Sequence, residues 1–363
     1  MGVRSVRDIS PAARAGYDAI IDVRSPSEFT EDHVPGAINL PVLHDAERAE
    51  VGTLYVQQSK FLARRRGAAL VARNISTHLD GALADRPGGF RPLVYCWRGG
   101  MRSGAMVTVM DQVGWPVARL DGGYQTWRRH VLALLHGASG RPAVSVQAFP
   151  WRLVLLDGPT GSGKTATLSH LADAGVQTLD LEGLAAHRGS LFGATGEPQP
   201  AQKLFESRLT AALEALDPAR PVVVEAESSR IGALVLPARL WAAMKAAPRI
   251  VLSAPQDVRA AYSLSEYAVL ASDAAMLDAA LARLPVRHGA RQIALWREMA
   301  RRAADRPALV AELLEIHYDP AYRRMAARFE APVAIVPAPL FASAPWAALA
   351  RLVSEIDRTS PPG

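Results

Sequence analysis

Short apolar runs alternate with amphipathic stretches along most of the chain. Residues 19–24 and 92–95 are runs of strand length, and polar turn residues follow each of them. Apolar strands separated by helical stretches are typical of parallel sheets that helices cover on both faces. The pattern therefore predicts an α/β fold. Further runs of this kind occupy residues 117–120, 152–157, 176–180, 221–225, 249–252 and 333–336.

The same pattern predicts two domains. A chain of 363 residues, 49% of them hydrophobic, is sufficient for two packed cores. Residues 136–150 contain glycine, serine and proline without periodicity, which predicts a linker. We expect one domain over residues 1–135 and a second over residues 151–363, the latter with a helical insertion and a C-terminal region.

Residues 331–350 carry no charge and approach the length of a membrane span. Four prolines interrupt them, and prolines break the backbone hydrogen bonding that a membrane demands. We therefore expect a buried strand followed by a helix, and no membrane partner. The first eight residues contain no apolar segment of the signal-peptide type, which favours a cytoplasmic protein.

Cys96 is the only cysteine, which excludes an intramolecular disulfide and a cysteine-based zinc site. It begins a loop that contains two glycines together with Arg98 and Arg102. The helix expected over residues 104–110 would direct its N-terminal amides and the positive end of its dipole at the sulfur. Such surroundings lower the pKa of a thiol and favour the reactive thiolate. We expect Cys96, Arg98 and Arg102 to be catalytic residues.

Charge adds a second indication. The formal net charge is +6, which suits a polyanionic partner such as nucleic acid. Clustered arginines are candidate phosphate contacts, although many such clusters are only solvated faces. These clusters are Arg64-Arg65-Arg66, Arg128-Arg129, Arg301-Arg302 and Arg323-Arg324.

Residues 158–165 read Gly-Pro-Thr-Gly-Ser-Gly-Lys-Thr and lie between an apolar run and a helical stretch. This is the phosphate-binding pattern G-x-x-x-x-G-K-T in the strand–loop–helix context that it requires. The loop amides surround a phosphate, the lysine supplies a positive charge and the threonine could hold magnesium. The predicted phosphate-binding residues are Gly158, Thr160, Gly161, Ser162, Gly163, Lys164 and Thr165.

Two further segments place polar side chains after predicted strands. Glu225 ends the run 221–225 and Glu227 follows it, where a P-loop protein commonly places a carboxylate that meets a metal or its water. Glycines accompany His187, Arg188 and Ser190, a composition that suits a substrate loop. These five residues are predicted to lie on the substrate or metal side of the site, and the sequence establishes no metal ligand.

Several motifs of the first domain resemble the rhodanese family. They are Asp22-Val23-Arg24, residues 28–41, the cysteine loop, and Leu120-Asp121-Gly122-Gly123 with Trp127. The resemblance implies that Cys96 carries a chalcogen as a persulfide or its selenium counterpart. The loop is one residue longer than is usual in rhodaneses and has the Cys-x5-Arg spacing of cysteine phosphatases. Tyr95 stands where those phosphatases often have histidine, and no acid for a leaving group is evident.

The cysteine loop, together with residues 181–193, 225–232 and 317–322, resembles tRNA 2-selenouridine synthases, in which a rhodanese domain precedes a P-loop domain. The resemblance implies an enzyme that acts on the wobble uridine of a tRNA anticodon stem-loop. The sulfur of 2-thiouridine would accept a geranyl group from geranyl diphosphate, and selenium from selenophosphate would then displace it. Both compounds would be co-substrates, no tightly bound cofactor is expected, and magnesium could neutralise the diphosphate.

Two alternatives from other classes remain open at this point. A rhodanese persulfide carrier fused to an ATP-dependent P-loop enzyme, a sulfurtransferase or kinase, would also combine these motifs. A non-enzymatic tRNA-binding module could use both domains as a scaffold. The resemblance implies geranyl diphosphate as the P-loop ligand, and the loop motif alone suits a nucleotide as well.

Overall fold

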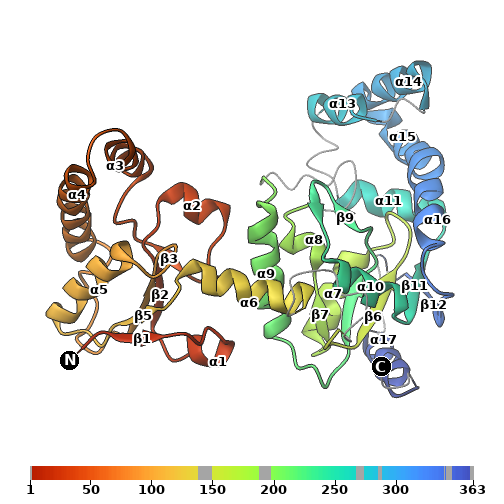
Figure 1. Ribbon diagram of the computed structural model, residues 1–363. Helices are drawn as coiled ribbons and strands as arrows, with labels where there is room; N and C mark the ends of the chain where they lie inside the picture. Colours follow the sequence, from red (N-terminus) through yellow and green to blue (C-terminus); the bar gives the residue numbers. More distant parts are fainter. Residues whose placement is uncertain are drawn as a thin grey trace. The chain divides into compact units, whose positions relative to one another are not determined.

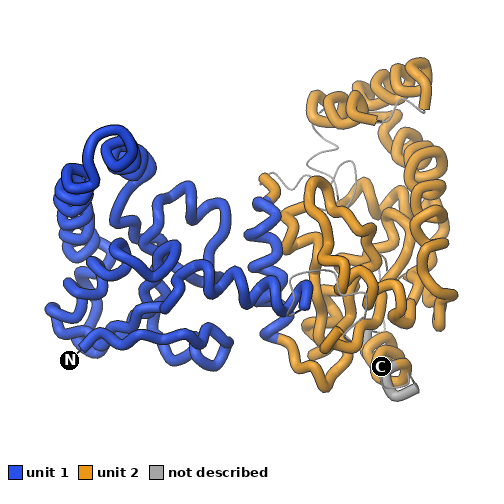
Figure 2. The backbone as a smooth tube through the Cα atoms, in the orientation of Figure 1, with its two compact units in different colours: residues 1–142, 200–215 blue, residues 143–199, 216–363 orange. Residues whose placement is uncertain are grey.

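The chain forms two compact units, which Figure 2 colours separately. The computed structural model describes residues 2–137, 149–187, 198–266, 274–284, 288–338, 340 and 346–359. Unit 1 comprises residues 1–142 and 200–215, and unit 2 comprises residues 143–199 and 216–363. The division near residue 142 lies inside the predicted linker, most of which is outside the described residues. Residues 200–215, predicted as part of the second domain, join unit 1.

Unit 1 is built on a five-stranded parallel sheet with the order β1-β5-β4-β2-β3 (Figure 1). The predicted runs at 19–24, 92–95 and 117–120 form three of its strands. Both faces of β4 are buried, which explains why its residues are all apolar or aromatic. The strands are β1 (Arg4–Val6), β2 (Ala19–Asp22), β3 (Ile38–Asn39), β4 (Pro92–Tyr95) and β5 (Ala118–Leu120).

Helices surround this sheet, and local sequence signals explain where some of them begin. Ser25 and Glu28 form a capping box at the start of α2. The helix expected over residues 104–110 begins three residues earlier, directly after Gly100. The helices are α1 (Pro11–Arg14), α2 (Pro26–Glu31), α3 (Asp45–Gln57), α4 (Lys60–Asp80), α5 (Met101–Val113), α6 (Tyr124–His136) and α9 (Gln202–Glu214).

Helix α9 joins unit 1 through side chains of α6. The buried Trp127 indole donates a hydrogen bond to Ser207 Oγ at 2.9 Å. Arg128 forms an ion pair with Glu206, and Arg14 forms one with Glu214. A helix from the C-terminal half of the sequence is thus part of the first unit. The residues of α9 alone do not predict that it packs there.

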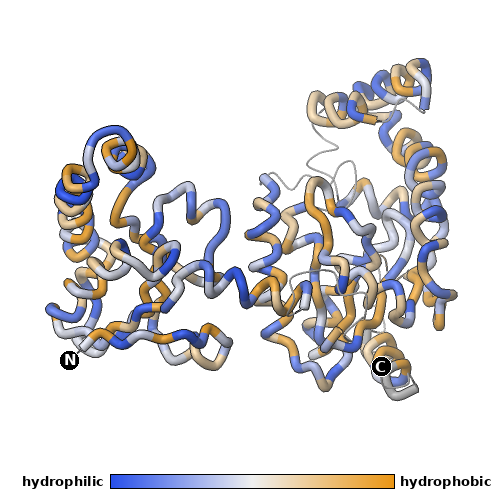
Figure 3. Tube along the Cα trace, in the orientation of Figure 1, coloured by the Kyte–Doolittle hydropathy of each residue, from blue (hydrophilic) through white to orange (hydrophobic). Residues whose placement is uncertain are grey.

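Unit 2 contains a second five-stranded parallel sheet with the order β12-β11-β6-β8-β7. This confirms the parallel sheet predicted from the apolar runs, and Figure 3 shows hydrophobic residues along its central strands. A short antiparallel pair, β9 and β10, follows β8. The strands are β6 (Leu153–Asp157), β7 (Gln177–Leu179), β8 (Val222–Glu225), β9 (Arg230–Ile231), β10 (Leu234–Val235), β11 (Arg249–Ser253) and β12 (Ala334–Pro337).

The helices of unit 2 include a group that packs around Trp296, away from the sheet core. This group corresponds to the predicted helical insertion. The helices are α7 (Lys164–Asp173), α8 (Leu181–Leu184), α10 (Ala238–Ala246), α11 (Gln256–Glu266), α13 (Ala274–Ala282), α14 (Ala290–Arg301), the 3₁₀ turn η2 (Ala303–Asp305), α15 (Arg306–Glu312), the π-helical η3 (Leu313–Tyr318), α16 (Asp319–Ala326) and α17 (Trp346–Thr359).

The prediction of a buried strand near residue 333 is wrong in one respect. The strand exists as β12, but it lies at the edge of the sheet, and Ile335 is 66% exposed. Its side chains alternate between half-buried and exposed, so one face of the strand is open to solvent. The helix expected after it is α17. Within the described parts of the chain, no helix combines the length and apolar character needed to cross a membrane.

Candidate functional site

Cys96 lies at the point where β4 ends and the loop to α5 begins. Its side chain is only 3% exposed and belongs to the core cluster that includes Val94 and Met106. Its Sγ atom lies 3.2 Å from the hydroxyl of Ser103, in the first turn of α5. The loop and the helix N-terminus therefore converge on the sulfur, as the sequence predicts.

These surroundings lower the pKa of Cys96 below its ordinary value. Burial by itself raises the pKa, because it disfavours the charged form. Hydrogen bonds from the Ser103 hydroxyl and from the amides of Ser103 and Arg98 oppose that effect, and the charge of Arg102 adds to them. The balance favours a thiolate, which is the nucleophilic form of cysteine.

The two loop arginines are in different situations. Arg102 forms two hydrogen bonds with Glu28, at 2.6 and 3.2 Å, so its charge acts on the sulfur while its donors are engaged. Arg98 is exposed, and none of the ion pairs formed by the described residues includes it. Of the two, Arg98 is the one able to meet an anionic substrate without breaking a bond inside the unit.

The Asp121-Gly122-Gly123 motif lies directly against the cysteine loop. The Tyr124 amide donates to the Cys96 carbonyl at 2.8 Å, and the Gln125 amide donates to the Trp97 carbonyl at 3.3 Å. Gly123 has a φ of +57°, and a Cβ atom there would collide with the Cys96 carbonyl. Only glycine satisfies both conditions, so this motif fixes the backbone of the loop.

A buried ion pair supports the loop from the other side. Arg24 pairs with Asp22 at 2.6 Å and donates to the Asp32 carbonyl at 2.6 Å. Its guanidinium lies 4.2 Å from the ring centre of Tyr124, and the Tyr124 hydroxyl donates to Asp32 at 2.6 Å. A buried charge is tolerated when it is paired and hydrogen-bonded in this way. The Asp22-Val23-Arg24 motif is thus structural.

In unit 2, residues 158–163 form the predicted glycine-rich loop between β6 and α7. Gly161 has a φ of +82°, and a Cβ atom there would lie 2.6 Å from Ser263 Oγ and 2.7 Å from the Arg259 carbonyl. Lys164 donates from Nζ to the Gly158 carbonyl at 2.8 Å, across the loop. This is the position in which the lysine can exchange a backbone oxygen for a phosphate oxygen.

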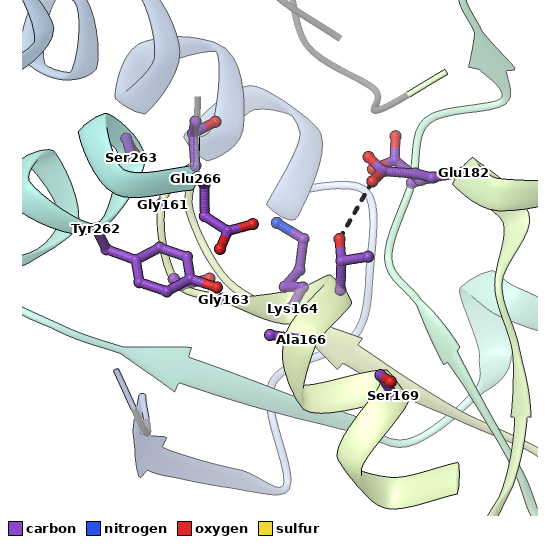
Figure 4. A pocket seen from close by; sticks show the side chains of 13 residues that line it. Gly161, Gly163, Lys164, Ala166, Ser169, Glu182, Tyr262, Ser263 and Glu266 are labelled. Atoms are coloured by element: carbon purple, nitrogen blue, oxygen red, sulfur yellow. Dashed lines mark hydrogen bonds between the residues drawn. The ribbon is translucent and has the colours of Figure 1, made fainter. Parts of the chain in front are cut away.

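A cavity of about 300 Å³ opens beside this loop (Figure 4). Six of the seven predicted phosphate-binding residues line it, and the seventh, Gly158, accepts the hydrogen bond from Lys164. Sequence reasoning missed the residues that α11 contributes, because nothing in that segment marks it as part of a site. The lining residues are Thr160, Gly161, Ser162, Gly163, Lys164, Thr165, Ala166, Ser169, Glu182, Glu227, Tyr262, Ser263 and Glu266.

Three glutamates gather beside Lys164 and Thr165. Glu225 is 1% exposed and accepts a hydrogen bond from the Glu182 amide at 2.8 Å. Glu182 lies in the first turn of α8 and approaches the Thr165 hydroxyl at 3.4 Å. Glu182 and Glu227 interact with each other. Sequence reasoning missed Glu182, although a carboxylate three positions after the end of β7 was an available signal.

Burial raises the pKa values of all three carboxyl groups, and repulsion from neighbouring carboxylates adds to this effect at Glu182 and Glu225. Burial, with the charge of Glu227, raises the pKa of Glu182 to about 8, against the opposing effect of Lys164. Burial and then the charge of Glu182 raise the pKa of Glu225. The pKa of Glu227 is also raised, mainly by burial. The cluster therefore holds protons near neutral pH when nothing positive is bound.

The loop is also held from behind by two buried arginines. Arg259 of α11 donates to the Thr160 carbonyl at 2.9 Å and forms a two-pronged ion pair with Asp319, at 2.8 and 3.0 Å. Arg249 pairs with Asp157 at 2.7 Å, and Asp157 accepts the Gly158 amide at 2.6 Å. The segment at 317–322, singled out in the sequence, thus contributes Asp319 as a support for the loop.

The predicted substrate loop is only partly described. His187 follows Ala186, whose φ of +48° is unusual for a residue with a side chain. The Nδ1 atom of His187 is buried and has no hydrogen-bond partner among the described residues. Arg188 and Ser190 lie outside the described residues. In the described parts of the chain, no group of three or more acidic, histidine or cysteine side chains is arranged to hold a metal ion.

Comparison with known proteins agrees with this arrangement. Residues 9–130 match the model of the rhodanese-like domain, and residues 151–336 match that of the tRNA 2-selenouridine synthase AAA domain. The tRNA 2-selenouridine synthase of Aeromonas salmonicida is 35% identical over 333 residues, which cover 84% of this chain and 86% of the relative. The synthase of Psychromonas ingrahamii is 34% identical over 255 residues, 70% of this chain.

A third relative, the tRNA 2-selenouridine synthase of Shewanella sp. (strain MR-7), is 36% identical over 251 residues, 68% of this chain. The chain spans about two thirds of the length of the Psychromonas and Shewanella relatives, 66% and 64% respectively. The Aeromonas alignment covers most of both proteins, and the two domain models match in order. The chain belongs to the tRNA 2-selenouridine synthase family.

Proposed function

We propose that this protein is a tRNA-modifying transferase that replaces sulfur by selenium in wobble 2-thiouridine. The observation that carries the proposal is the pairing, in one chain of this family, of a buried low-pKa cysteine with a phosphate-type cavity. Neither a sulfur carrier alone nor a P-loop enzyme alone needs both. The reaction takes place in the cytoplasm and needs no membrane.

The first step is transfer of a geranyl group from geranyl diphosphate. The thiocarbonyl sulfur of the uridine attacks the first carbon of the geranyl chain, a carbon–sulfur bond forms, the carbon–oxygen bond breaks and diphosphate leaves. The uridine loses its N3 proton to solvent in the same step. Lys164 and the loop amides bind the diphosphate and stabilise the charge that develops on it. Lys164 and residues 160–163 of the loop line the cavity of about 300 Å³.

The second step is displacement of the geranylated sulfur by selenium. Alkylation makes this sulfur a better leaving group, because it departs as a thiol and not as sulfide. The selenium of selenophosphate, which the amides of the cysteine loop hold, attacks C2 of the uridine and expels geranyl thiol. The Cys96 thiolate then takes the phosphoryl group, which breaks the selenium–phosphorus bond and leaves 2-selenouridine, and water hydrolyses the S-phosphocysteine to phosphate. Arg98 lies at the exposed side of that loop and binds the anionic donor.

The carboxylates of the P-loop site explain how an anionic ligand enters an acidic cavity. Glu182 retains a proton up to a pH of about 8, so the cluster carries less negative charge than its composition suggests. If magnesium accompanies the diphosphate, Thr165 and Glu182 offer the hydroxyl and carboxylate oxygens that the ion prefers. Magnesium would neutralise the departing diphosphate.

The competing function is an ATP-dependent P-loop enzyme joined to a persulfide carrier. Lys164 and Thr165 favour this alternative, because a lysine and a threonine at these positions suit a nucleotide as well as they suit geranyl diphosphate. Turnover of ATP that depends on sulfur-containing tRNA would support this alternative.

The deciding experiment uses the purified full-length protein with tRNA that contains wobble 2-thiouridine. Geranyl diphosphate alone should give S-geranylated nucleoside, and selenophosphate added next should give 2-selenouridine, both measured by mass spectrometry of digested tRNA. Parallel reactions with ATP in place of geranyl diphosphate are the control. If ATP supports modification and geranyl diphosphate does not, the proposed donor is wrong.

A further inference from the structure

Helices α3 and α4 of unit 1 form a hairpin whose turn exposes large hydrophobic side chains. Tyr55 is 47% exposed, Val56 82% and Phe61 70%. These three residues lie within seven positions of one another, at the end of α3 and the start of α4. Single exposed apolar residues are common on proteins, but a group that includes two aromatic rings indicates a contact surface.

The same turn carries positive charge that no acidic residue balances. Lys60, Arg64 and Arg65 are exposed, and none of the ion pairs within the described chain includes them. Their neighbours on α4 differ, since Arg66 pairs with Glu50 at 2.7 Å and Arg73 pairs with Glu47 at 2.6 Å. Residues 51–79 contain no aspartate or glutamate. We call residues 55–65 the hairpin tip.

The aromatic and basic side chains of the tip are interleaved. The Nζ atom of Lys60 lies 5.7 Å from the centre of the Tyr55 ring. Phe61 follows Lys60 directly, and Arg64 and Arg65 occupy the next turn of α4. Proteins that bind single-stranded nucleic acid combine aromatic rings, on which bases stack, with positive charges that follow the phosphates.

The other end of the hairpin is attached to the cysteine loop. Asp45, the first residue of α3, accepts hydrogen bonds from Ser27. Arg48 pairs at 3.4 Å with Glu28, the same carboxylate that binds Arg102. A helix of 13 residues spans about 20 Å, so the tip lies roughly that far from the attachment at α2. An RNA that presents one base to Cys96 can extend over this distance.

We propose that the hairpin tip binds unpaired bases and adjacent phosphates of the tRNA substrate. Tyr55 and Phe61 stack on bases, and Lys60, Arg64 and Arg65 bind phosphates. The inference rests on the proposed function and adds to it the surface that holds the RNA while its wobble base reaches the cysteine loop. A second copy of this chain fits less well, because pairing two such tips would bring six unbalanced positive charges together.

The test compares tRNA affinity of the full-length protein and its variants by fluorescence anisotropy over a range of salt concentrations. Phe61→Ala with Tyr55→Ala should weaken binding about tenfold or more, with an unchanged salt dependence, because stacking is lost. Arg64→Gln with Arg65→Gln should weaken binding and reduce the slope of log affinity against log salt by about 1.4, or about 0.7 per lost phosphate contact.

Arg66→Gln is the matched control for the arginine pair. It removes a positive charge from the same helix, but Glu50 already forms an ion pair with this arginine. The affinity of the Arg66→Gln protein for tRNA should therefore stay within about twofold of the wild type. Thermal melting and the rate of Cys96 alkylation by iodoacetamide should be unchanged in all three proteins. Those readouts establish that unit 1 is folded and that its cysteine loop is intact.

Three results would overturn the inference. Wild-type affinity and salt dependence in both the aromatic and the arginine variants would show that the tip does not bind RNA. Loss of a wild-type oligomer in the aromatic variant, with tRNA affinity unchanged, would identify the tip as a self-association surface. Failure of the wild-type protein to bind tRNA would remove the proposed function as well, which separates that failure from the first two.

Discussion

The cysteine loop and the P-loop share one backbone architecture, but the side chains around them differ. Each is a glycine-rich turn from a buried parallel strand to the N-terminus of a helix, where amides favour negative charge. In the cysteine loop, the hydroxyl of Ser103 and nearby amides already lie against the sulfur. In the P-loop, Lys164 is folded onto the Gly158 carbonyl, and acidic side chains line the cavity.

This difference shows how one motif serves two purposes. The cysteine loop contains its own negative charge, so its donors are arranged before any substrate arrives. The P-loop cavity must accept a charge from outside, and its carboxyl groups must remain protonated or be neutralised when that happens. A rise in pH therefore favours the thiolate of Cys96 and opposes anion binding next to Glu182.

The largest effect is expected from a change at Cys96, which should stop one reaction step and leave the other intact. Cys96→Ser should abolish selenium incorporation, because a neutral serine hydroxyl is a much weaker nucleophile toward phosphorus than the thiolate, and should leave geranyl transfer and the fold nearly unchanged. S-geranylated tRNA should accumulate, as measured by mass spectrometry of tRNA nucleosides. Normal selenouridine formation by this variant would remove the nucleophilic role assigned to Cys96.

Lys164→Ala tests the other loop and should give the opposite result. Geranyl transfer should fall about 100-fold, the size typical of removing one group that stabilises developing charge. Selenation of tRNA that is supplied already geranylated should largely survive. Lys245→Ala, at an exposed position of α10 in the same unit, is the control. Equal loss of both steps would mean that the P-loop serves the whole reaction.

Asp319→Asn tests whether the P-loop depends on its support. The change leaves the buried Arg259 without its charged partner, and breaking such a pair costs about 3 kcal/mol of unfolding free energy. Because Arg259 also holds the Thr160 carbonyl, the affinity for inorganic diphosphate should fall about tenfold. Alkylation of Cys96 should not change. Asp278→Asn, which breaks a more exposed pair with Arg297, should cost about 1 kcal/mol or less.

Local sequence reasoning identified both loops because each carries its signal in consecutive residues. The glycine positions, Lys164 and Cys96 all follow from the strand–loop–helix pattern, and the two parallel sheets follow from the apolar runs. The supporting residues could not be found in this way. Arg259 meets Thr160 across 99 positions of sequence, and the Arg128 ion pair with Glu206 spans 78 positions. Such contacts depend on packing that short patterns do not encode.

The pH dependence of the acidic cluster gives an effect on diphosphate affinity that is confined to high pH. Glu182 is protonated below a pKa of about 8, so a rise in pH through this value adds negative charge beside the diphosphate site. Glu182→Gln mimics the protonated form, and its affinity for inorganic diphosphate should exceed that of the wild type by about tenfold at pH 9. Near pH 6 the two should agree. The ratio of the two proteins, measured by calorimetry, cancels the titration of the ligand itself.

The smallest effect is expected for Ser103→Ala, which tests how much one hydroxyl contributes to the low pKa of Cys96. In the thiol form the hydroxyl donates to the Gly100 carbonyl at 3.2 Å, and in the thiolate form it can turn to donate to the sulfur. Ser103→Ala removes that donor, so the pKa of Cys96 should rise. The rate of alkylation by iodoacetamide at pH 7 should fall by less than about tenfold, and the rate at high pH should match the wild type.

The matched control for Ser103 is Thr108→Ala on the same helix. The Thr108 hydroxyl donates to the Gly104 carbonyl at 2.9 Å in the same kind of bond within a helix, and it is exposed. This variant should keep the wild-type pH profile. Equal profiles for Ser103→Ala and the wild type would mean that amides and charge alone lower the pKa of Cys96. The cysteine loop would then resemble the P-loop, with a helix N-terminus as its main source of anion stabilisation.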